Sequence, residues 1–154
     1  MRGVSICLSA AVIGTIVMGS AAGAADRATK DEAIAMVNKA VDYIKANGTD
    51  KAYAAFDKKD GGFVDRDLYI VVYGLNGVVY AHGANAKLIG TNQMDAKDPD
   101  GKAFVAERIA LAKKGQPFWQ DYKFMDPLTH TVQPKEMYCV PLNDTAVCGG
   151  VYKP

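Results

Sequence analysis

The stretch LYIVVYGLNGVVYAH, residues Leu68–His82, decides the fold because it predicts two β-strands joined by a tight turn. β-Branched and aromatic residues run up to Asn76-Gly77, the pair typical of a two-residue type I′ turn. With that turn, we expect Tyr73 to lie opposite Tyr80 and Val71 opposite His82, because residues equidistant from the turn pair across the hairpin.

Alternation along the two strands sorts their side chains onto two faces. One face is aliphatic and is expected to pack against a helix. The other carries tyrosines and one histidine, whose polar atoms need hydrogen-bond partners when buried. That second face is the candidate wall of a ligand pocket. The aliphatic set is Leu68, Ile70, Val72, Val79 and Ala81, and the polar set is Tyr69, Val71, Tyr73, Val78, Tyr80 and His82.

The first 25 residues predict a cleaved secretory signal peptide. Arg2 precedes an apolar run from about Val4 to Met18, and only small residues follow, from Gly19 to Ala25. The run is shorter than the roughly 20 residues that span a bilayer, so an uncleaved anchor is the weaker alternative. Residues 26–154 are therefore expected to form one exported, periplasmic domain.

The charge balance excludes some partners. The formal net charge is +1, and Arg2 is the one charged residue among the first 25, so the remaining chain is neutral. Nucleic acids and anionic membrane surfaces attract proteins with a positive excess, so neither is expected as a partner.

Helical patterns flank the hairpin. Thr29 and Glu32 form a capping box before a helix from about Lys30 to Ala46, whose apolar residues recur at helical spacing. A short helix is expected from Thr49 through Phe56, and an amphipathic one over Lys102–Lys114.

Three more strands are predicted at Phe118–Met125, Pro134–Leu142 and Thr145–Tyr152. Together with the hairpin, they predict an α+β fold with an antiparallel five-stranded sheet and its helices mostly on one side.

Cys139 and Cys148 are the two cysteines outside the predicted signal peptide. Counting outward from a turn at Asn143-Asp144 places them directly opposite each other, within the reach of a disulfide. An oxidising compartment favours such a bridge. A redox-active pair or metal ligands are the alternative, although no C-x-x-C spacing supports them.

No motif predicts catalysis, a metal site or a cofactor. His82 and His130 are far apart in the sequence, and neither stands beside a nucleophile motif. No glycine-rich phosphate loop is present. The protein is therefore not expected to be an enzyme, and a small-metabolite enzyme with His82 as general base is kept as an alternative.

Six motifs in order resemble the single Cache domain of the second type, the extracytoplasmic ligand-binding module of bacterial chemoreceptors and sensor kinases. They cover about Thr29 to Tyr152 and are Ala81-His82, Leu88-Ile89-Gly90-x-Asn92, Asp98-x-Asp100-Gly101-Lys102, Trp119-x-x-Tyr122-x-Phe124, Pro134-Lys135-x-x-Tyr138 and Gly149-x-Val151-Tyr152. Two departures are Gly83, where the family commonly has proline, and the cysteine pair in a hairpin that is commonly rich in tryptophan.

The resemblance implies a PAS-like fold, with a long N-terminal helix on one face of the sheet and a ligand pocket on the other. It implies that the protein binds small organic acids, often short carboxylates. By position, the ligand-binding residues would be Tyr73, Tyr80, His82, Trp119, Tyr122 and Lys135.

We therefore expect a free-standing exported protein that senses or delivers a short carboxylate through a membrane chemoreceptor, sensor kinase or transporter. The chain ends at Pro154 without a signalling domain, which suggested the free-standing form. The alternative from another class is an envelope or interaction module that binds no small ligand.

Overall fold

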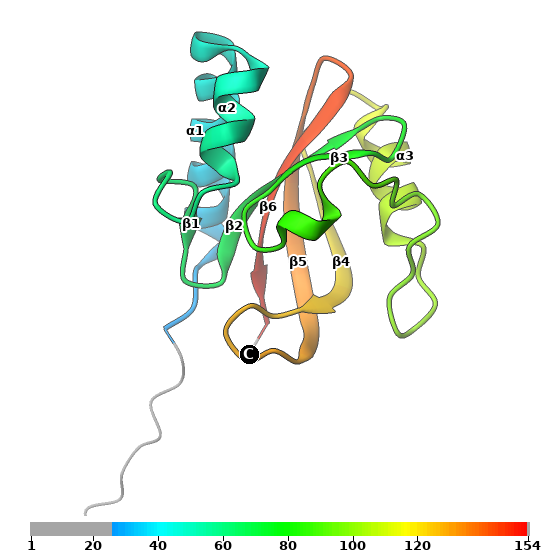
Figure 1. Ribbon diagram of the computed structural model, residues 1–154. Helices are drawn as coiled ribbons and strands as arrows, with labels where there is room; N and C mark the ends of the chain where they lie inside the picture. Colours follow the sequence, from blue (N-terminus) through cyan, green and yellow to red (C-terminus); the bar gives the residue numbers. More distant parts are fainter. Residues whose placement is uncertain (1–25, 154) are drawn as a thin grey trace, which may run out of the picture.

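The computed structural model describes residues 26–153, and the predicted signal peptide lies outside them. Three α-helices, one short 3-10 helix and six strands follow one another along the chain (Figure 1). In order they are α1 (Lys30–Asn47), α2 (Thr49–Phe56), β1 (Val64–Asp65), β2 (Leu68–Gly74), β3 (Val79–His82), η1 (Ala86–Leu88), α3 (Phe104–Ala112), β4 (Phe118–Met125), β5 (Val132–Leu142) and β6 (Thr145–Tyr152). No helix among these residues is both long and apolar enough to span a bilayer.

Helix α1 begins and ends as its sequence predicts. The Thr29 hydroxyl accepts a hydrogen bond from the Glu32 amide, and the Glu32 carboxylate accepts one from the Thr29 amide, which completes the capping box. Gly48 ends the helix with φ 80° and donates its amide to the carbonyl of Ile44. The predicted boundaries are thus correct to within one residue.

The sheet is antiparallel, with the strand order β1-β2-β6-β5-β4 and with β3 also paired to β2. It has six strands, one more than predicted, because Val64–Asp65 forms a two-residue strand against β2. The predicted α+β, PAS-like architecture is otherwise confirmed.

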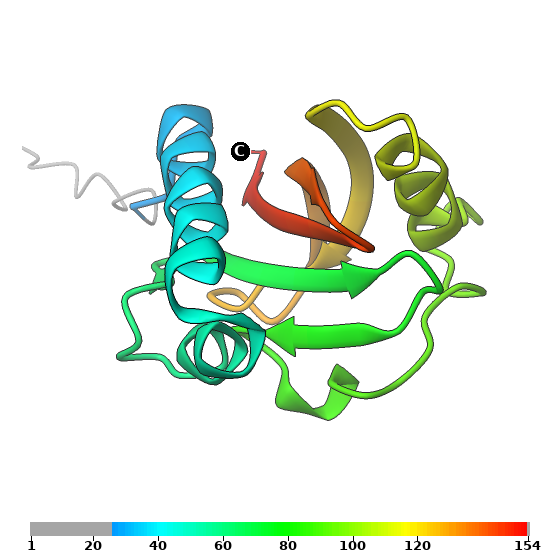
Figure 2. The same cartoon turned by 90° about the horizontal axis from the view of Figure 1, so that it is seen from above.

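The helices cover both faces of the sheet (Figure 2). Helices α1 and α2 pack on one face, where Val37 and Ala40 meet Ile70, Val72 and Val147 in an apolar core. Helix α3 covers part of the opposite face, and its apolar residues join a core that includes the β2 tyrosines. The prediction of helices mostly on one side therefore holds for two of the three.

The turn between β2 and β3 differs from the predicted type I′ turn. Gly77 has φ 85° and donates its amide to Gly74, whereas Asn76 is not among the residues with positive φ. This is a type I turn followed by a glycine bulge, which adds one residue to the loop. Val71 still lies opposite His82, but Tyr73 lies opposite Val79, so the predicted pairing of Tyr73 with Tyr80 is wrong. The register shifts again between Val72 and Tyr73, where Tyr80 is the extra residue, so His82 keeps its partner while Val79 and Tyr80 exchange faces.

The hairpin of β5 and β6 has the predicted register. Leu142 pairs with Thr145 and Cys139 with Cys148, as counted from the turn. The two sulfur atoms form a disulfide with an S–S distance of 2.08 Å, which confirms the expected bridge. Both cysteines are buried on the face that α3 covers.

Candidate functional site

Three side chains that are cationic or can become so lie buried on the α3 side of the sheet, and we call them the cationic cluster. They are Arg108 of α3, Lys135 of β5 and His82 of β3, with exposed fractions of 0%, 0% and 2%. Charged side chains are rarely buried without a partner because removing a charge from water is costly. The cluster therefore marks the most unusual environment in the domain.

Arg108 lies within the buried stripe of α3, between apolar residues one turn away on either side. Its Nε donates to Oε1 of Gln120 at 3.0 Å. The guanidinium carbon is 4.8 Å from the ring centres of both Tyr73 and Tyr122, so two aromatic faces hold it. Its two terminal nitrogens are buried and have no hydrogen-bond partner among the described residues. The guanidinium fork thus keeps unused hydrogen-bond donors in the protein interior.

Lys135 is surrounded by aromatic rings. Its Nζ is 4.0 Å from the ring centre of Tyr69 and 4.5 Å from that of Tyr152, whose hydroxyl accepts a hydrogen bond from Nζ at 3.4 Å. Burial, and then the nearby charge of Arg108, hold the pKa of Lys135 well below its usual range. The surroundings of Lys135 therefore disfavour its charged form.

His82 is fixed by its own loop. Its Nδ1 accepts hydrogen bonds from the amides of Ala84 and Asn85 at 3.3 and 3.0 Å, so the neutral ring carries its proton on Nε2. Burial, and then the charges of Lys135 and Arg108, lower the pKa of His82 to about 3. The ring is a hydrogen-bond donor through Nε2 and remains neutral near pH 7.

Gly83, which replaces the commoner proline, lets this loop approach the core. A Cβ at this position would lie 2.9 Å from Cγ2 of Val64 and 3.1 Å from the carbonyl oxygen of Phe56. The close approach needs a residue without a side chain, and it holds the amides of the next two residues against His82.

The buried carboxylates nearby are already engaged. Arg27 donates to Asp67 at 3.2 Å and to Asp126 at 2.6 Å, and both carboxylates are buried. Their charges raise the pKa of Lys135, but they do so less than burial and Arg108 lower it. No salt bridge to Arg108 or Lys135 occurs within residues 26–153, so the cluster has no internal counter-ion at bonding distance.

A cavity of about 420 Å³ opens onto this region from outside. Its inner wall includes His82, Tyr69 and Phe124, and its rim includes Leu128 and His130 of the β4–β5 turn. The cavity gives a solute a path to the edge of the cationic cluster. Within the described part of the chain, no group of three or more His, Cys, Asp or Glu side chains is arranged to hold a metal ion.

The structure brings together four of the six residues expected at the site. All four are buried: Tyr73 and Tyr122 lie against Arg108, and His82 and Lys135 lie against Tyr69, near enough to Arg108 for its charge to lower the pKa of each. Arg108 was not expected there. One signal could have revealed it, because a charged residue occupies the apolar stripe that Phe104, Val105, Ile109 and Ala112 define at helical spacing.

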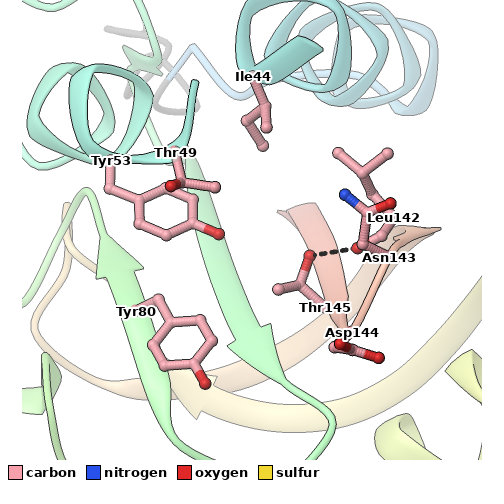
Figure 3. Close-up of a pocket in the computed structure, with 8 residues that line it drawn as sticks. All are labelled: Ile44, Thr49, Tyr53, Tyr80, Leu142, Asn143, Asp144 and Thr145. Carbon is pink, nitrogen blue, oxygen red and sulfur yellow. Dashed lines mark hydrogen bonds between the residues drawn. The ribbon is translucent and has the colours of Figure 1, made fainter. Parts of the chain in front are cut away.

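Tyr80 lies on the other side of the sheet because of the glycine bulge. It is 37% exposed and its ring stacks on that of Tyr53 of α2, with the centres 6.1 Å apart. The two rings lie in a surface groove of about 290 Å³ that faces the β5–β6 turn at Asn143 and Thr145 (Figure 3). Tyr80 is therefore left out of the candidate site.

Trp119 also lies on the opposite face. Its ring packs 5.2 Å from that of Tyr138, and Nζ of Lys30 in α1 lies 5.1 Å from its centre. Trp119 and Tyr122 are three residues apart in one strand, so alternation sends them to opposite faces. Trp119 is therefore not part of the buried cluster around Arg108.

These features, a long helix on one face and a buried polar cluster on the other, define a PAS-like ligand-binding domain. The sequence matches the family described as Single Cache domain 2 over residues 9–151. The chain belongs to this family. Cache domains of this kind are sensor and chemoreceptor domains and are typically periplasmic or extracellular.

Solved structures and one sensor kinase are similar to the chain. A methyl-accepting chemotaxis protein from Vibrio parahaemolyticus RIMD 2210633 is 25% identical, with a TM-score of 0.68 over 80% of this chain and 87% of that one. A Cache chemosensory domain described for its carboxylic acid recognition is 22% identical, with a TM-score of 0.68 over 80% of this chain and 92% of that one.

The sensor histidine kinase MctS of Rhizobium johnstonii (strain DSM 114642 / LMG 32736 / 3841) is 36% identical over 78 residues. The matched region is 51% of this chain and 17% of the kinase. The kinase is thus much longer than the part that the chain matches.

Proposed function

We propose that this domain senses a small carboxylate, which binds inside the fold with its two oxygens on the terminal nitrogens of Arg108. The observation that carries the proposal is the unpaired, buried guanidinium fork. A planar fork matches the geometry of a carboxylate, and the charge-assisted bonds would replace the water that Arg108 loses on folding.

Lys135 and His82 support the same class of ligand. Both can donate a hydrogen bond, His82 through Nε2 and Lys135 through its amine or ammonium. An anion near Lys135 would raise its pKa, because it favours the charged amine. The tyrosine rings around the cluster would exclude water from the bound ligand.

A sensor needs a second conformation that binds the ligand more tightly than the first. Only such a difference in affinity lets the ligand shift the equilibrium between the two. Occupancy would supply the counter-ion that the cluster lacks and draw the neighbouring Gly83–Asn85 loop, which already contacts His82, toward the ligand. The relatives in chemotaxis and histidine kinases suggest that a membrane chemoreceptor, sensor kinase or transporter receives the signal. We place the domain in the periplasm, in accordance with its predicted signal peptide.

The environment of His82 argues against the enzymatic alternative. A general base works best with a pKa near the operating pH. The pKa of His82 is lowered to about 3, and its Nδ1 lone pair is occupied by two amides. His82 is therefore a poor proton acceptor near neutral pH.

The test is a thermal-shift screen of the purified protein against acetate, propionate and pyruvate, each compared with its neutral amide. A carboxylate at about 100 times its dissociation constant should stabilise the fold by roughly 2.7 kcal/mol, which is several degrees. Arg108→Met should abolish the shift, whereas Lys113→Met, which removes an exposed cation from the end of the same helix, should preserve it.

A flat response of the wild-type protein to every anion would refute the proposal. It would favour an interaction module, and the next search would be for a protein partner.

A further inference from the structure

Gln120 of β4 is the side chain that holds Arg108. It is 3% exposed and lies two residues from Tyr122, on the same face of the strand. Its Oε1 accepts the hydrogen bond from Nε of Arg108 at 3.0 Å, and its Nε2 donates to the carbonyl oxygen of Phe104 at 2.8 Å. Only this orientation of the amide satisfies both partners, because a carbonyl accepts and Nε–H donates.

This arrangement leaves the guanidinium with one free edge. Gln120 occupies Nε, and the rings of Tyr73, Tyr122 and Phe104 surround the guanidinium carbon at 4.8, 4.8 and 5.5 Å. The terminal nitrogens form the edge that remains, and both are unpaired among the described residues. The fork is thus held in one direction before any anion arrives, which lowers the entropy lost on binding.

Gln120 has the size and shape of a residue that could be the counter-ion of Arg108, but it carries no charge. Glutamate has the same length and could place a carboxylate within hydrogen-bond distance of Arg108. Such a side chain would complete a buried ion pair and remove the need for an external anion. Glutamine instead positions the guanidinium and leaves its charge uncompensated.

We propose that Gln120 is a positioning residue that makes this site dependent on an external carboxylate, by orienting Arg108 without neutralising it. The inference rests on the proposed function and deepens it. If Gln120 served packing alone, the preference for carboxylate over amide would not depend on whether residue 120 is charged.

The experiment measures the affinity of the full chain for acetate and propionate, and for the neutral amide of each, by calorimetry and thermal shift. Gln120→Glu supplies the internal carboxylate, and Gln120→Met removes both hydrogen bonds without supplying charge. Gln116→Glu makes the same chemical change in the exposed segment before β4 and is the matched control.

Gln120→Glu should weaken carboxylate binding by at least about 30-fold and abolish the preference for carboxylate over amide. Gln120→Met should weaken carboxylate binding by about tenfold while keeping the preference, because Arg108 remains charged but less well oriented. Gln116→Glu should bind as the wild type does.

The outcomes separate the two proposals. If the wild type binds carboxylates and Gln120→Glu retains their affinity within threefold, Gln120 does not set the anion requirement, although the sensor function stands. Wild-type affinity in Gln120→Met would overturn the inference as well, and this variant decides the question if Gln120→Glu fails to fold. If the wild type binds neither carboxylate, the function itself fails, and the inference with it.

Discussion

The two faces of the sheet are built from different chemistry. On the α1 and α2 side, a cluster of buried apolar side chains includes Phe56, Ile70 and Val72. On the α3 side, tyrosines surround Arg108, Lys135 and His82, and the guanidinium keeps two unpaired nitrogens.

The difference shows where stability is gained and where it is lost. Buried aliphatic and aromatic groups stabilise the fold by about 1.5–3 kcal/mol per side chain. Buried cations without counter-ions destabilise it, and proteins retain such residues at sites where a ligand binds or a reaction occurs. Both faces therefore supply stability through buried apolar side chains, and the α3 face loses part of its share to Arg108, Lys135 and His82.

The largest effect is expected on the helix side. Phe56 is fully buried, and its ring centre lies 4.5 Å from that of Phe63. Phe56→Ala should lower the free energy of unfolding by about 3–5 kcal/mol in urea titrations, because it leaves a cavity. Carboxylate affinity should change little. A loss below about 1 kcal/mol would mean that this face is not the main source of stability.

Substitution on the other face should have the opposite sign. Lys135 has one hydrogen-bond partner, the Tyr152 hydroxyl, and is completely buried. Lys135→Met should raise the free energy of unfolding at pH 7 by on the order of 1–3 kcal/mol, because an apolar side chain of similar length replaces a desolvated amine. The same variant should bind carboxylates more weakly. Destabilisation instead would show that Lys135 is structural.

The stability of the α3 face should depend on pH through His82. Its pKa is lowered to about 3 in the fold, against 6.5 in an unfolded chain, so the unfolded state binds the proton first as the pH falls. The contribution of neutral His82 to the free energy of unfolding is therefore complete above pH 6.5 and is lost as the pH falls toward 3.

Between about pH 6.5 and about pH 4.5, the free energy of unfolding should therefore fall by about 2 kcal/mol less in His82→Gln than in the wild type, as measured by urea unfolding. His130→Gln, in the exposed β4–β5 turn, is the matched control and should behave like the wild type. Equal pH dependence in all three proteins would contradict the buried, neutral state of His82.

The smallest effect concerns the turn that assigns residues to the faces. A Cβ on Gly77 would meet Oδ1 of Asn92 at 2.9 Å, and φ is 85°. Gly77→Ala should cost about 1 kcal/mol or slightly more in thermal unfolding, from both strain and crowding. Gly90→Ala is a useful control, because φ is 80° but no atom lies within 4 Å of its Cβ. Equal costs for the two would show that crowding at Gly77 is relieved without loss.

Most of the fold could be predicted from local patterns. The capping box, the helical spacing in α1 and the register of β5 with β6 depend on neighbouring residues, and each was confirmed. The strand β1 was missed because two residues give no periodicity, and its pairing with β2 depends on the tertiary structure.

The site was harder to predict, because its members come from separate elements. Side chains alternate between the two faces along β4, so the spacing of Trp119 and Tyr122 already predicts that they lie on opposite faces. The loss of Tyr80 could not be foreseen from alternation, since it depends on which turn Asn76-Gly77 forms. Arg108 was overlooked because charged residues are common on amphipathic helices, and only its position within the apolar stripe distinguishes it.

The glycine bulge also bears on how this pocket could change during evolution. If the loop closed instead as a two-residue turn at Asn76-Gly77, Leu75 would pair with Val78 and Tyr80 would return to the face of Tyr73, with Val79 on the helix side. Pocket composition can therefore be altered by the conformation of a surface turn, without any substitution in the core.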